Sequence, residues 1–192
     1  MSYIAKIGLS NKHLHLKTAD IETLFGKGHT LTPIKDLVQP GQFACDEKVD
    51  IVGPKGVLKG VRVLGPARPE TQVELSMTDA RTIGIKAPIK ESGKLDGTPG
   101  CKIVGPAGEV DLDHGVIVAL RHIHLSPAQA VEAGVKDKQI ISIKIAGERG
   151  LTFNNVLVRS GEGHQSEIHL DTDEGNSAGC GANTEATIVN PL

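Results

Sequence analysis

The sequence predicts a mainly β protein made of two similar β-rich halves. Most of the chain consists of short runs of β-branched residues that end at glycine and proline, as at residues 49–54. Closely spaced runs of this kind are typical of β-barrels and β-sandwiches. Two segments, 18–25 and 126–133, have a clear helical pattern, and the second begins with a Ser-Pro pair suited to a helix N-terminus.

An internal repeat relates the two halves. The His-Leu-His-Leu run at 13–16 matches His-Ile-His-Leu at 122–125, and each run stands shortly before one of the helical segments. Further matches follow in the same order along both halves: 53–57 with 147–151, 61–63 with 156–158, Glu74 with His169, Asp79 with Glu174, Arg81 with Asn176 and Gly84 with Gly179. Both halves therefore place a potential metal ligand, Glu74 or His169, at the same position.

The composition narrows the classes of partner. Hydrophobic residues make up 39% of the chain, with three Phe, one Tyr and no Trp, so little aromatic surface can stack on nucleic-acid bases. The formal net charge of -2 argues against a basic groove for a polyanion. We therefore expect no nucleic-acid partner, whereas a small anion remains a suitable ligand.

The sequence has no pattern of a membrane or secreted protein. No segment approaches the roughly 20 apolar residues of a membrane span, and the first residues lack the apolar stretch of a signal peptide. Cys45, Cys101 and Cys180 are widely spaced and form no Cys-x-x-Cys pair, which fits reduced thiols. We expect a cytoplasmic protein with no membrane partner, in which the cysteines are small buried hydrophobes.

Two candidate metal sites follow from the repeat. Residues i and i+2 of a strand point to the same face, so each His-x-His run places two imidazoles side by side. Adding the third residue from the matched position gives two ligand sets: His13, His15 and Glu74, and His122, His124 and His169. Three protein ligands leave one coordination position open, which is typical of catalytic zinc.

The alternative is that each pair consists of surface or hydrogen-bonding histidines on an edge strand. The repeat disfavours this interpretation, because both pairs and both third ligands lie in register. His29, His114 and His164 stand alone and are expected to be ordinary polar residues.

Arg68 lies six residues before Glu74 in a segment stiffened by two prolines. Its guanidinium fork suits a phosphate or a carboxylate, although a solvated loop residue fits the sequence equally well. Lys35 and Arg62 could add positive charge. The chain has neither a P-loop nor a Gly-x-Gly-x-x-Gly motif after a strand, so a nucleotide would bind without those cradles.

Four segments together resemble the PduL-type phosphate acyltransferases, or phosphate propanoyltransferases: 10–15 (Ser-Asn-Lys-His-Leu-His), 65–74 with Arg68, 121–124 (Arg-His-Ile-His) and 167–170 (Glu-Ile-His-Leu). The resemblance runs through nearly the whole chain. It implies reversible transfer of a short acyl group, propanoyl or acetyl, between coenzyme A and orthophosphate. It also implies two small β-barrel domains with short capping helices, 12–119 and 120–192 completed by 1–11, with two zinc ions in the crevice between them.

The resemblance assigns residues to roles. It makes His13, His15 and Glu74 ligands of one zinc ion, whose open position takes the coenzyme thiolate, and His122, His124 and His169 ligands of the other, in agreement with the repeat. Arg68 would hold the phosphate, with Ser92 as a further candidate. The coenzyme A site would be lined by Leu9, Ser10, Asn11, Lys35, Arg62, Leu64 and Asn176.

The resemblance also bears on assembly and location. It implies a homodimer. Family members packed into bacterial microcompartments carry an amphipathic N-terminal targeting extension, whereas 12 residues precede His13 here. That favours a free cytoplasmic enzyme, or a chain that has been shortened.

Two other functions use the same residue types. A dimetal hydrolase would direct water at an ester or phosphate, but amidohydrolases, which also begin with His-x-His, need a (β/α)₈ barrel of about 250 residues with many helices. A metal-storage or ligand-binding β-protein is the non-enzymatic alternative; cupins use His-x-His but add a Glu a few residues later and are not duplicated in this way.

Overall fold

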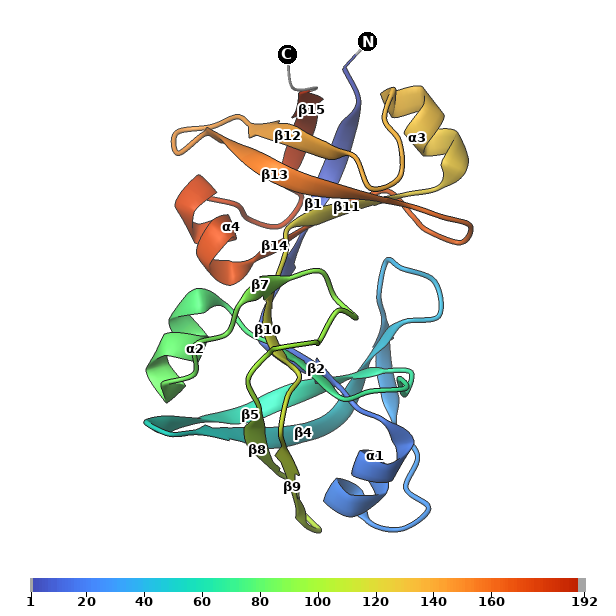
Figure 1. Cartoon of the computed structure of the whole chain (residues 1–192). Coiled ribbons are helices and arrows are strands. Elements are labelled where there is room, and N and C mark those ends of the chain that lie inside the picture. The colour runs from blue at the N-terminus through green and yellow to red at the C-terminus, as the bar shows by residue number, and fades with distance from the viewer. Residues whose placement is uncertain (1, 190–192) are drawn as a thin grey trace. The chain divides into compact units, whose positions relative to one another are not determined.

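The structure is a computed structural model that describes residues 2–189. Within these residues the chain is mainly β, with four short helices (Figure 1). No helix in the described part is both long and apolar enough to cross a membrane.

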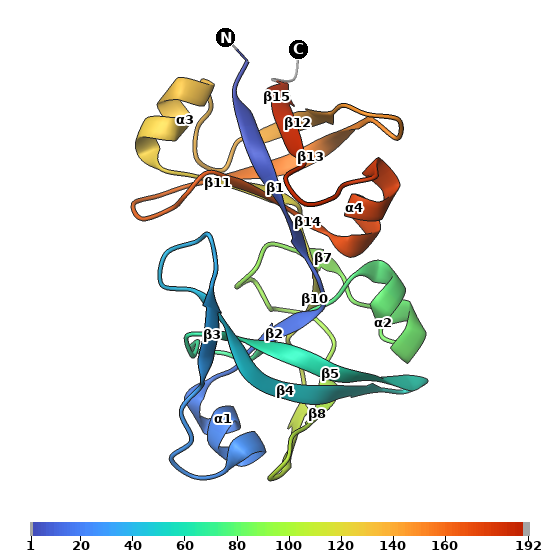
Figure 2. The same cartoon turned by 180° about the vertical axis from the view of Figure 1, so that it is seen from behind.

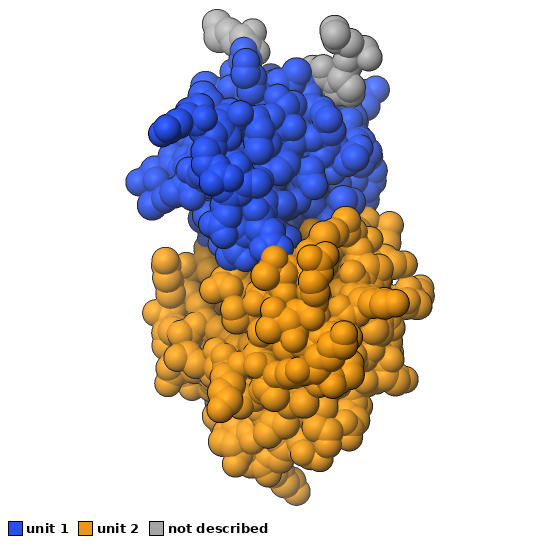
Figure 3. All heavy atoms as spheres, turned by 90° about the vertical axis from the view of Figure 1, so that its left-hand side faces the viewer, with its two compact units in different colours: residues 1–10, 38–40, 120–192 blue, residues 11–37, 41–119 orange. Residues whose placement is uncertain are grey.

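The chain divides into two compact units, which Figure 3 shows in different colours. Of the described residues, those within 1–10, 38–40 and 120–192 form unit 1, and those within 11–37 and 41–119 form unit 2. Residues 38–40 belong to unit 1 although the chain on either side belongs to unit 2; the Gln39 side-chain amide donates to the Gln165 carbonyl at 3.0 Å. Each unit has its own hydrophobic core.

Unit 1 contains a closed six-stranded barrel with the strand order β1-β14-β11-β13-β12-β15. The strands are β1 (Ile4–Ser10), β11 (His122–Leu125), β12 (Ile140–Ile145), β13 (Leu151–Ser160), β14 (Glu167–Asp171) and β15 (Glu185–Val189). β1 runs parallel to β14, and β11 runs parallel to β13. Antiparallel pairing of β1 with β15 completes the ring, so no strand of the barrel is left as an edge.

Alternation along the strands builds the barrel core. In β12, Ile141, Ile143 and Ile145 are each at most 1% exposed, whereas the residues between them are more exposed. Side chains of a strand point alternately to its two faces, so this period of two places three isoleucines inside. Ile123 and Ile168, from β11 and β14, are fully buried in the same cluster.

Two capped helices belong to unit 1. α3 (Pro127–Ala133) begins with a capping box, in which the Ser126 hydroxyl accepts from the Gln129 amide and the Gln129 side chain accepts from the Ser126 amide. α4 (Thr172–Ala178) begins with the same arrangement between Asp171 and Glu174. Both helices end at a glycine in the left-handed conformation.

Unit 2 contains an open nine-stranded sheet in the order β7-β10-β6-β2-β5-β4-β8-β9, with β3 pairing with β4 beside this path (Figure 2). The strands are β2 (His13–His15), β3 (Pro33–Asp36), β4 (Phe43–Gly53), β5 (Gly56–Gly65), β6 (Gln72–Glu74), β7 (Ile89–Lys90), β8 (Cys101–Val104), β9 (Glu109–Leu112) and β10 (Val116–Ala119). Two helices, α1 (Thr18–Phe25) and α2 (Met77–Ile83), complete the unit. Its core includes the fully buried Leu14, Ile51 and Ile103.

The second barrel implied by the resemblance is not closed in the structure. β10 runs parallel to β6 as β1 does to β14, and β8 runs antiparallel to β4 as β15 does to β12. However, β8 forms a hairpin with β9, so both of its edges are occupied by β4 and β9. Unit 1 has the pairing of β1 with β15 at the equivalent place. In unit 2, the Val116 amide donates to the Pro99 carbonyl at 3.0 Å and the Gly115 amide donates to Thr98 Oγ1 at 2.9 Å.

The helical predictions are confirmed for 18–25 and 126–133, which form α1 and α3 with Ser126 as the cap. α2 and α4 were not predicted. Both are seven residues long and contain Thr, Asp, Asn, Ser or Gly, which have low helix propensity. Their side-chain caps and terminal glycines supply the start and stop signals.

Strand register confirms the internal repeat. His13 lies opposite Glu74 in the β2–β6 pair, and His122 lies opposite His169 in the β11–β14 pair. On the other side, His13 pairs with Arg62 and His122 pairs with Leu157, as the sequence alignment of 61–63 with 156–158 predicts. The two units therefore share a four-stranded arrangement, β6-β2-β5-β4 in unit 2 and β14-β11-β13-β12 in unit 1. Along the chain, α2 follows β6 and α4 follows β14.

Candidate metal centres

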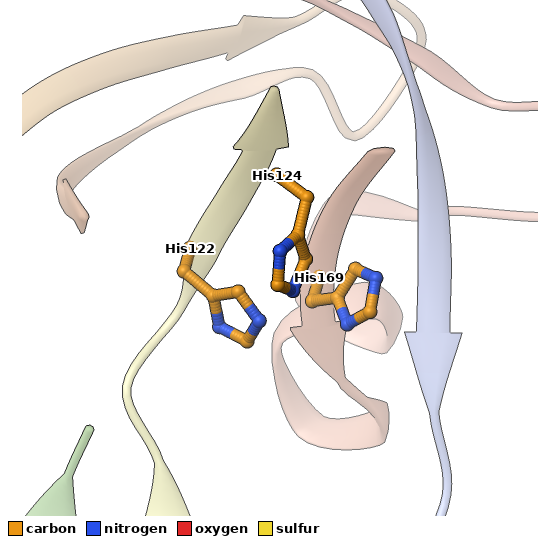
Figure 4. A group of neighbouring side chains, drawn as sticks. All are labelled: His122, His124 and His169. Atoms are coloured by element: carbon orange, nitrogen blue, oxygen red, sulfur yellow. The ribbon is translucent and has the colours of Figure 1, made fainter. Parts of the chain in front are cut away.

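In unit 1, three imidazoles converge on one point (Figure 4). His122 and His124 come from the same face of β11, and His169 comes from β14 directly opposite His122. One ring nitrogen from each lies within 4.8 Å of the others. The ring centroid of His169 is 4.8 Å from that of His122 and 4.9 Å from that of His124.

In unit 2, the equivalent positions place two imidazoles and one carboxylate together. His13 and His15 lie on one face of β2, and Glu74 of β6 lies opposite His13. The three ligand atoms again lie within 4.8 Å of one another. His13 Nε2 is 3.5 Å from Glu74 Oε2.

Within each group, a hydrogen bond fixes which ring nitrogen of the first histidine faces the other two residues. His13 Nδ1 donates to the Asn11 carbonyl and His122 Nδ1 donates to the Leu120 carbonyl, each at 2.8 Å, which leaves Nε2 of both rings for coordination. Among the described residues, the buried Nδ1 atoms of His15 and His124 have no hydrogen-bond partner. A buried polar atom without a partner is costly, and a metal ion in each group would satisfy it.

The electrostatics keep His15 and His124 neutral and Glu74 ionised; burial lowers the pKa of His13, but the charge and hydrogen bond of Glu74 outweigh it and raise that pKa overall. Burial, with the nearby Arg68 and His13, lowers the pKa of His15 to about 3. Burial, with His122 and His169, lowers the pKa of His124 to about 2. Burial by itself raises the pKa of Glu74, but the charge and hydrogen bond of His13 outweigh it and the net direction is downward. Neutral imidazole and carboxylate are zinc ligands, so both sets fit the ion.

Arg68 and Ser92, the predicted phosphate ligands, lie together beside Glu74. The Arg68 backbone amide donates to the Leu16 carbonyl at 2.9 Å, which holds the residue just beyond β2. Arg68 Nη1 donates to Ser92 Oγ at 3.2 Å, and Ser92 Oγ donates to Glu74 Oε1 at 3.2 Å. The guanidinium is therefore one hydroxyl away from a candidate metal ligand.

The predicted coenzyme A residues are divided between the two units. In unit 1, Leu9 and Ser10 end β1 and Asn176 lies in α4. A Cβ on Gly175 would lie 2.4 Å from Leu9 Cδ2, so α4 packs closely on the end of β1.

In unit 2, Asn11 precedes β2, and the other three residues lie on β3 and β5. Lys35 pairs with Ala44, which pairs in turn with Leu64. The Arg62 guanidinium donates to the Cys45 carbonyl.

The three single histidines have different surroundings. His29 bonds Glu47 at 2.8 Å and His114 bonds Asp113 at 2.5 Å, as expected for ordinary polar residues. His164, however, packs edge-on against the candidate ligand His124, with ring centroids 4.6 Å apart. Its Nδ1 donates to the Arg159 carbonyl at 3.0 Å.

The cysteines are poor nucleophiles in this fold. Cys45 and Cys101 are buried, as the sequence analysis predicts, and Cys180 is half-buried. Burial raises the pKa of Cys45 to about 11 and that of Cys101 to about 12, and it also raises the pKa of Cys180. A thiol that stays protonated at neutral pH is a weak nucleophile.

Sequence reasoning missed the residues that support the ligands. The cation just before each His-x-His run pairs with an acid in the first turn of the helix after the third ligand: Lys12 with Asp79 at 3.3 Å, and Arg121 with Glu174 at 2.7 Å. The repeat already matched Asp79 with Glu174, so extending it to the two cations would have revealed the pairs.

Gln72 and Glu167 were also missed. Each lies two residues before the third ligand of its unit and bonds that ligand, at 2.5 Å for Gln72 and 2.7 Å for Glu167. Their equal offset from Glu74 and His169 was visible in the sequence.

Comparison with known proteins identifies the family. The family model described as phosphate propanoyltransferase matches residues 6–181. A phosphate propanoyltransferase of Clostridioides difficile is 50% identical over 184 residues, covering 96% of this chain and 88% of the relative. Those of Thermotoga maritima and Salmonella typhimurium are 53% and 52% identical, each covering 90% of this chain and 82% of the relative. The chain therefore belongs to the phosphate propanoyltransferase family.

Proposed function

We propose that this protein reversibly transfers a short acyl group, propanoyl or acetyl, between coenzyme A and orthophosphate, and that it does so with two zinc ions. The family and the names of its relatives support acyl transfer to phosphate. One observation carries the metal proposal: a set of three potential ligands stands in the same strand register in both units, two histidines with a glutamate in unit 2 and three histidines in unit 1. The partnerless buried nitrogens of His15 and His124 add to it.

In this proposal the six clustered residues are ligands, three for each ion: His13, His15 and Glu74, and His122, His124 and His169. A zinc ion held there supplies a Lewis acid that lowers the pKa of a bound thiol and polarises a carbonyl oxygen. The low pKa values of His15 and His124 keep both imidazoles neutral at neutral pH, so one nitrogen of each ring has a lone pair for the ion.

Arg68 has the role of holding the phosphate in this scheme. Its guanidinium already donates to Ser92 Oγ beside Glu74, so a phosphate at this point would meet a planar cation and a hydroxyl. The phosphate oxygen attacks the thioester carbonyl, a carbon–oxygen bond forms, and the carbon–sulfur bond breaks as the coenzyme leaves as a thiolate. No enzyme nucleophile is needed, and the protonated cysteines agree with direct transfer.

The residues proposed to bind coenzyme A are Leu9, Ser10, Asn11, Lys35, Arg62, Leu64 and Asn176. The proposal includes a homodimer, which light scattering of the purified protein tests. It also requires both ligand sets to act on the same substrates, so the loss of either set should abolish transfer.

The experiment is a pair of activity assays on zinc-loaded protein. Propanoyl phosphate or acetyl phosphate is mixed with coenzyme A, and thioester absorbance is followed with and without a chelator. We expect thioester formation that needs coenzyme A and is lost with the metal; the ratio of kcat/KM for the two acyl phosphates gives the preferred group. Breakdown of acyl phosphate without coenzyme would instead indicate a dimetal hydrolase, and a zinc-loaded but inert protein would indicate a binding protein.

A further inference from the structure

Each candidate metal site has a hydrogen-bonding partner on its third ligand, supplied from the same strand. On β6, Gln72 Nε2 donates to Glu74 Oε1 at 2.5 Å. On β14, Glu167 Oε2 accepts from His169 Nε2 at 2.7 Å. Residues i and i+2 of a strand lie side by side on one face, so the position is the same in both units. The chemistry is opposite: an amide donor beside a carboxylate ligand, and a carboxylate acceptor beside an imidazole ligand.

We propose that Gln72 and Glu167 are positioning residues, each matched to the third metal ligand of its unit, so that the identity of the partner must change with the identity of the ligand. This inference rests on the proposed metal function. Neither residue touches the ion or the substrate in the proposal; each acts through the ligand beside it.

The surroundings of Gln72 fix its amide in one orientation. The side chain is buried, and its Oε1 accepts from the Gly93 amide at 2.7 Å while its Nε2 also donates to Ser92 Oγ at 2.8 Å. A flipped amide would turn its NH₂ group toward the Gly93 N–H, two donors facing each other. Only a donor can therefore face Glu74. With Oε1 of Glu74 held by Gln72, Oε2 remains on the side of His13 Nε2, where the ion would lie.

The partner in unit 1 sets the tautomer of its ligand. A carboxylate only accepts hydrogen bonds, so Glu167 requires the proton of His169 on Nε2 and leaves Nδ1 for the ion. Space for this carboxylate exists because β1 has a glycine at this point: Gly8 pairs with His169, and a Cβ on Gly8 would lie 2.6 Å from Glu167 Oε1.

The matching also equalises the charge at the two sites. Unit 2 supplies its single carboxylate directly as the ligand Glu74, with a neutral amide behind it. Unit 1 supplies three imidazoles, with the carboxylate of Glu167 hydrogen-bonded to the third of them, His169. Each zinc ion would therefore be balanced by one nearby carboxylate, and a carboxylate behind a ligating imidazole raises the basicity of that ring.

An exchange of pairs tests the matching in unit 2. All variants are made in the full chain carrying His124→Ala, which removes one ligand of the unit 1 site. Zinc affinity, determined by chelator competition, then reports on the unit 2 site. Glu74→His alone leaves an amide donor facing an imidazole, whereas Gln72→Glu with Glu74→His reproduces the pair of unit 1. We expect the double variant to bind zinc about 10-fold or more tighter than Glu74→His alone, since outer partners of this kind contribute about 10- to 100-fold to metal affinity. A double variant that binds no tighter than the single one would overturn the proposal.

Two substitutions test unit 1 in the otherwise unchanged protein. Glu167→Gln keeps the size of the side chain but removes its charge, and Gly8→Ala keeps the carboxylate but displaces it. Both should weaken zinc binding by about 10-fold or more and lower kcat more than they raise the KM of coenzyme A. Gly181→Ala is the matched control, because a Cβ there meets nothing within 4 Å.

The outcomes separate this inference from the proposed function. Wild-type protein that binds no zinc would overturn both. If the wild type binds zinc, and Glu167→Gln and Gly8→Ala bind it as tightly as Gly181→Ala does, only the positioning role is overturned.

Discussion

Removal of the Arg68 guanidinium is predicted to impair acyl transfer without loss of zinc. In Arg68→Ala the backbone bond from residue 68 to the Leu16 carbonyl remains, so the loop should keep its path. The lost interactions include the bond to Ser92 Oγ, the attraction to the Glu74 carboxylate and the proposed two-point contact with phosphate. Removing one preorganised donor from a reacting oxyanion costs about 10²–10³ in kcat, or about 2.7–4 kcal/mol. We expect a loss of at least this size.

The assay measures kcat and the KM of phosphate and of coenzyme A in both directions. Arg68→Lys should recover part of the loss, because an ammonium keeps the charge but not the planar fork. Ser92→Ala should have a smaller effect, since it removes one neutral hydroxyl. Arsenate-driven breakdown of acyl-CoA should fall in parallel with the normal reaction. A folded, zinc-loaded Arg68→Ala protein with near-normal dependence on phosphate would refute this reasoning and leave Arg68 as a loop residue.

Three further predictions concern residues outside the two candidate ligand sets. Replacing all three cysteines with alanine should lower stability but leave substantial acyl transfer, and an acyl group trapped on any of them in the wild type would contradict direct transfer. Ser126→Ala should lower the free energy of unfolding by about 1 kcal/mol in urea titration with unchanged zinc content, because it removes the cap of α3; an unchanged midpoint would show that the cap contributes nothing. Arg121→Ala should destabilise the protein by about 1–3 kcal/mol, because it leaves Glu174 without its 2.7 Å partner and removes the cation over Phe153. Arg121→Lys should recover part of that stability, and equal stability of all three proteins would exclude the ion pair as a support.

The two candidate ligand sets could be predicted because the relevant geometry is local or duplicated. A strand places residues i and i+2 on one face, so each His-x-His pair follows directly from its spacing. The third ligand comes from a different strand, and only the repeat located it. His13 opposite Glu74 and His122 opposite His169 then confirmed that the matched positions are equivalent in space.

Other features depend on pairing between distant parts of the chain. The sheet of unit 2 does not close into a barrel because β9 pairs with the edge of β8 that closure would need. Nothing in the run 101–104 indicates that β8 pairs with β9. Gln72 and Glu167 were missed because a comparison of the halves looks for similar residues at matched positions. Here the neighbouring third residues, Glu74 and His169, differ, so their hydrogen-bonding partners differ as well. α2 and α4 were missed because caps and packing, rather than helix propensity, define them.

The most direct test of the two-zinc account is the zinc content of the protein and of one variant from each unit, measured together with acyl transfer. Metal-depleted protein is titrated with zinc and analysed by elemental analysis after removal of excess ion. Because the structure has two independent three-ligand sets, we predict about two ions per chain in the wild type and about one in either His13→Ala or His122→Ala, with transfer abolished in both. One ion or fewer in the wild type, with His122→Ala leaving that content and the activity unchanged, would contradict the account.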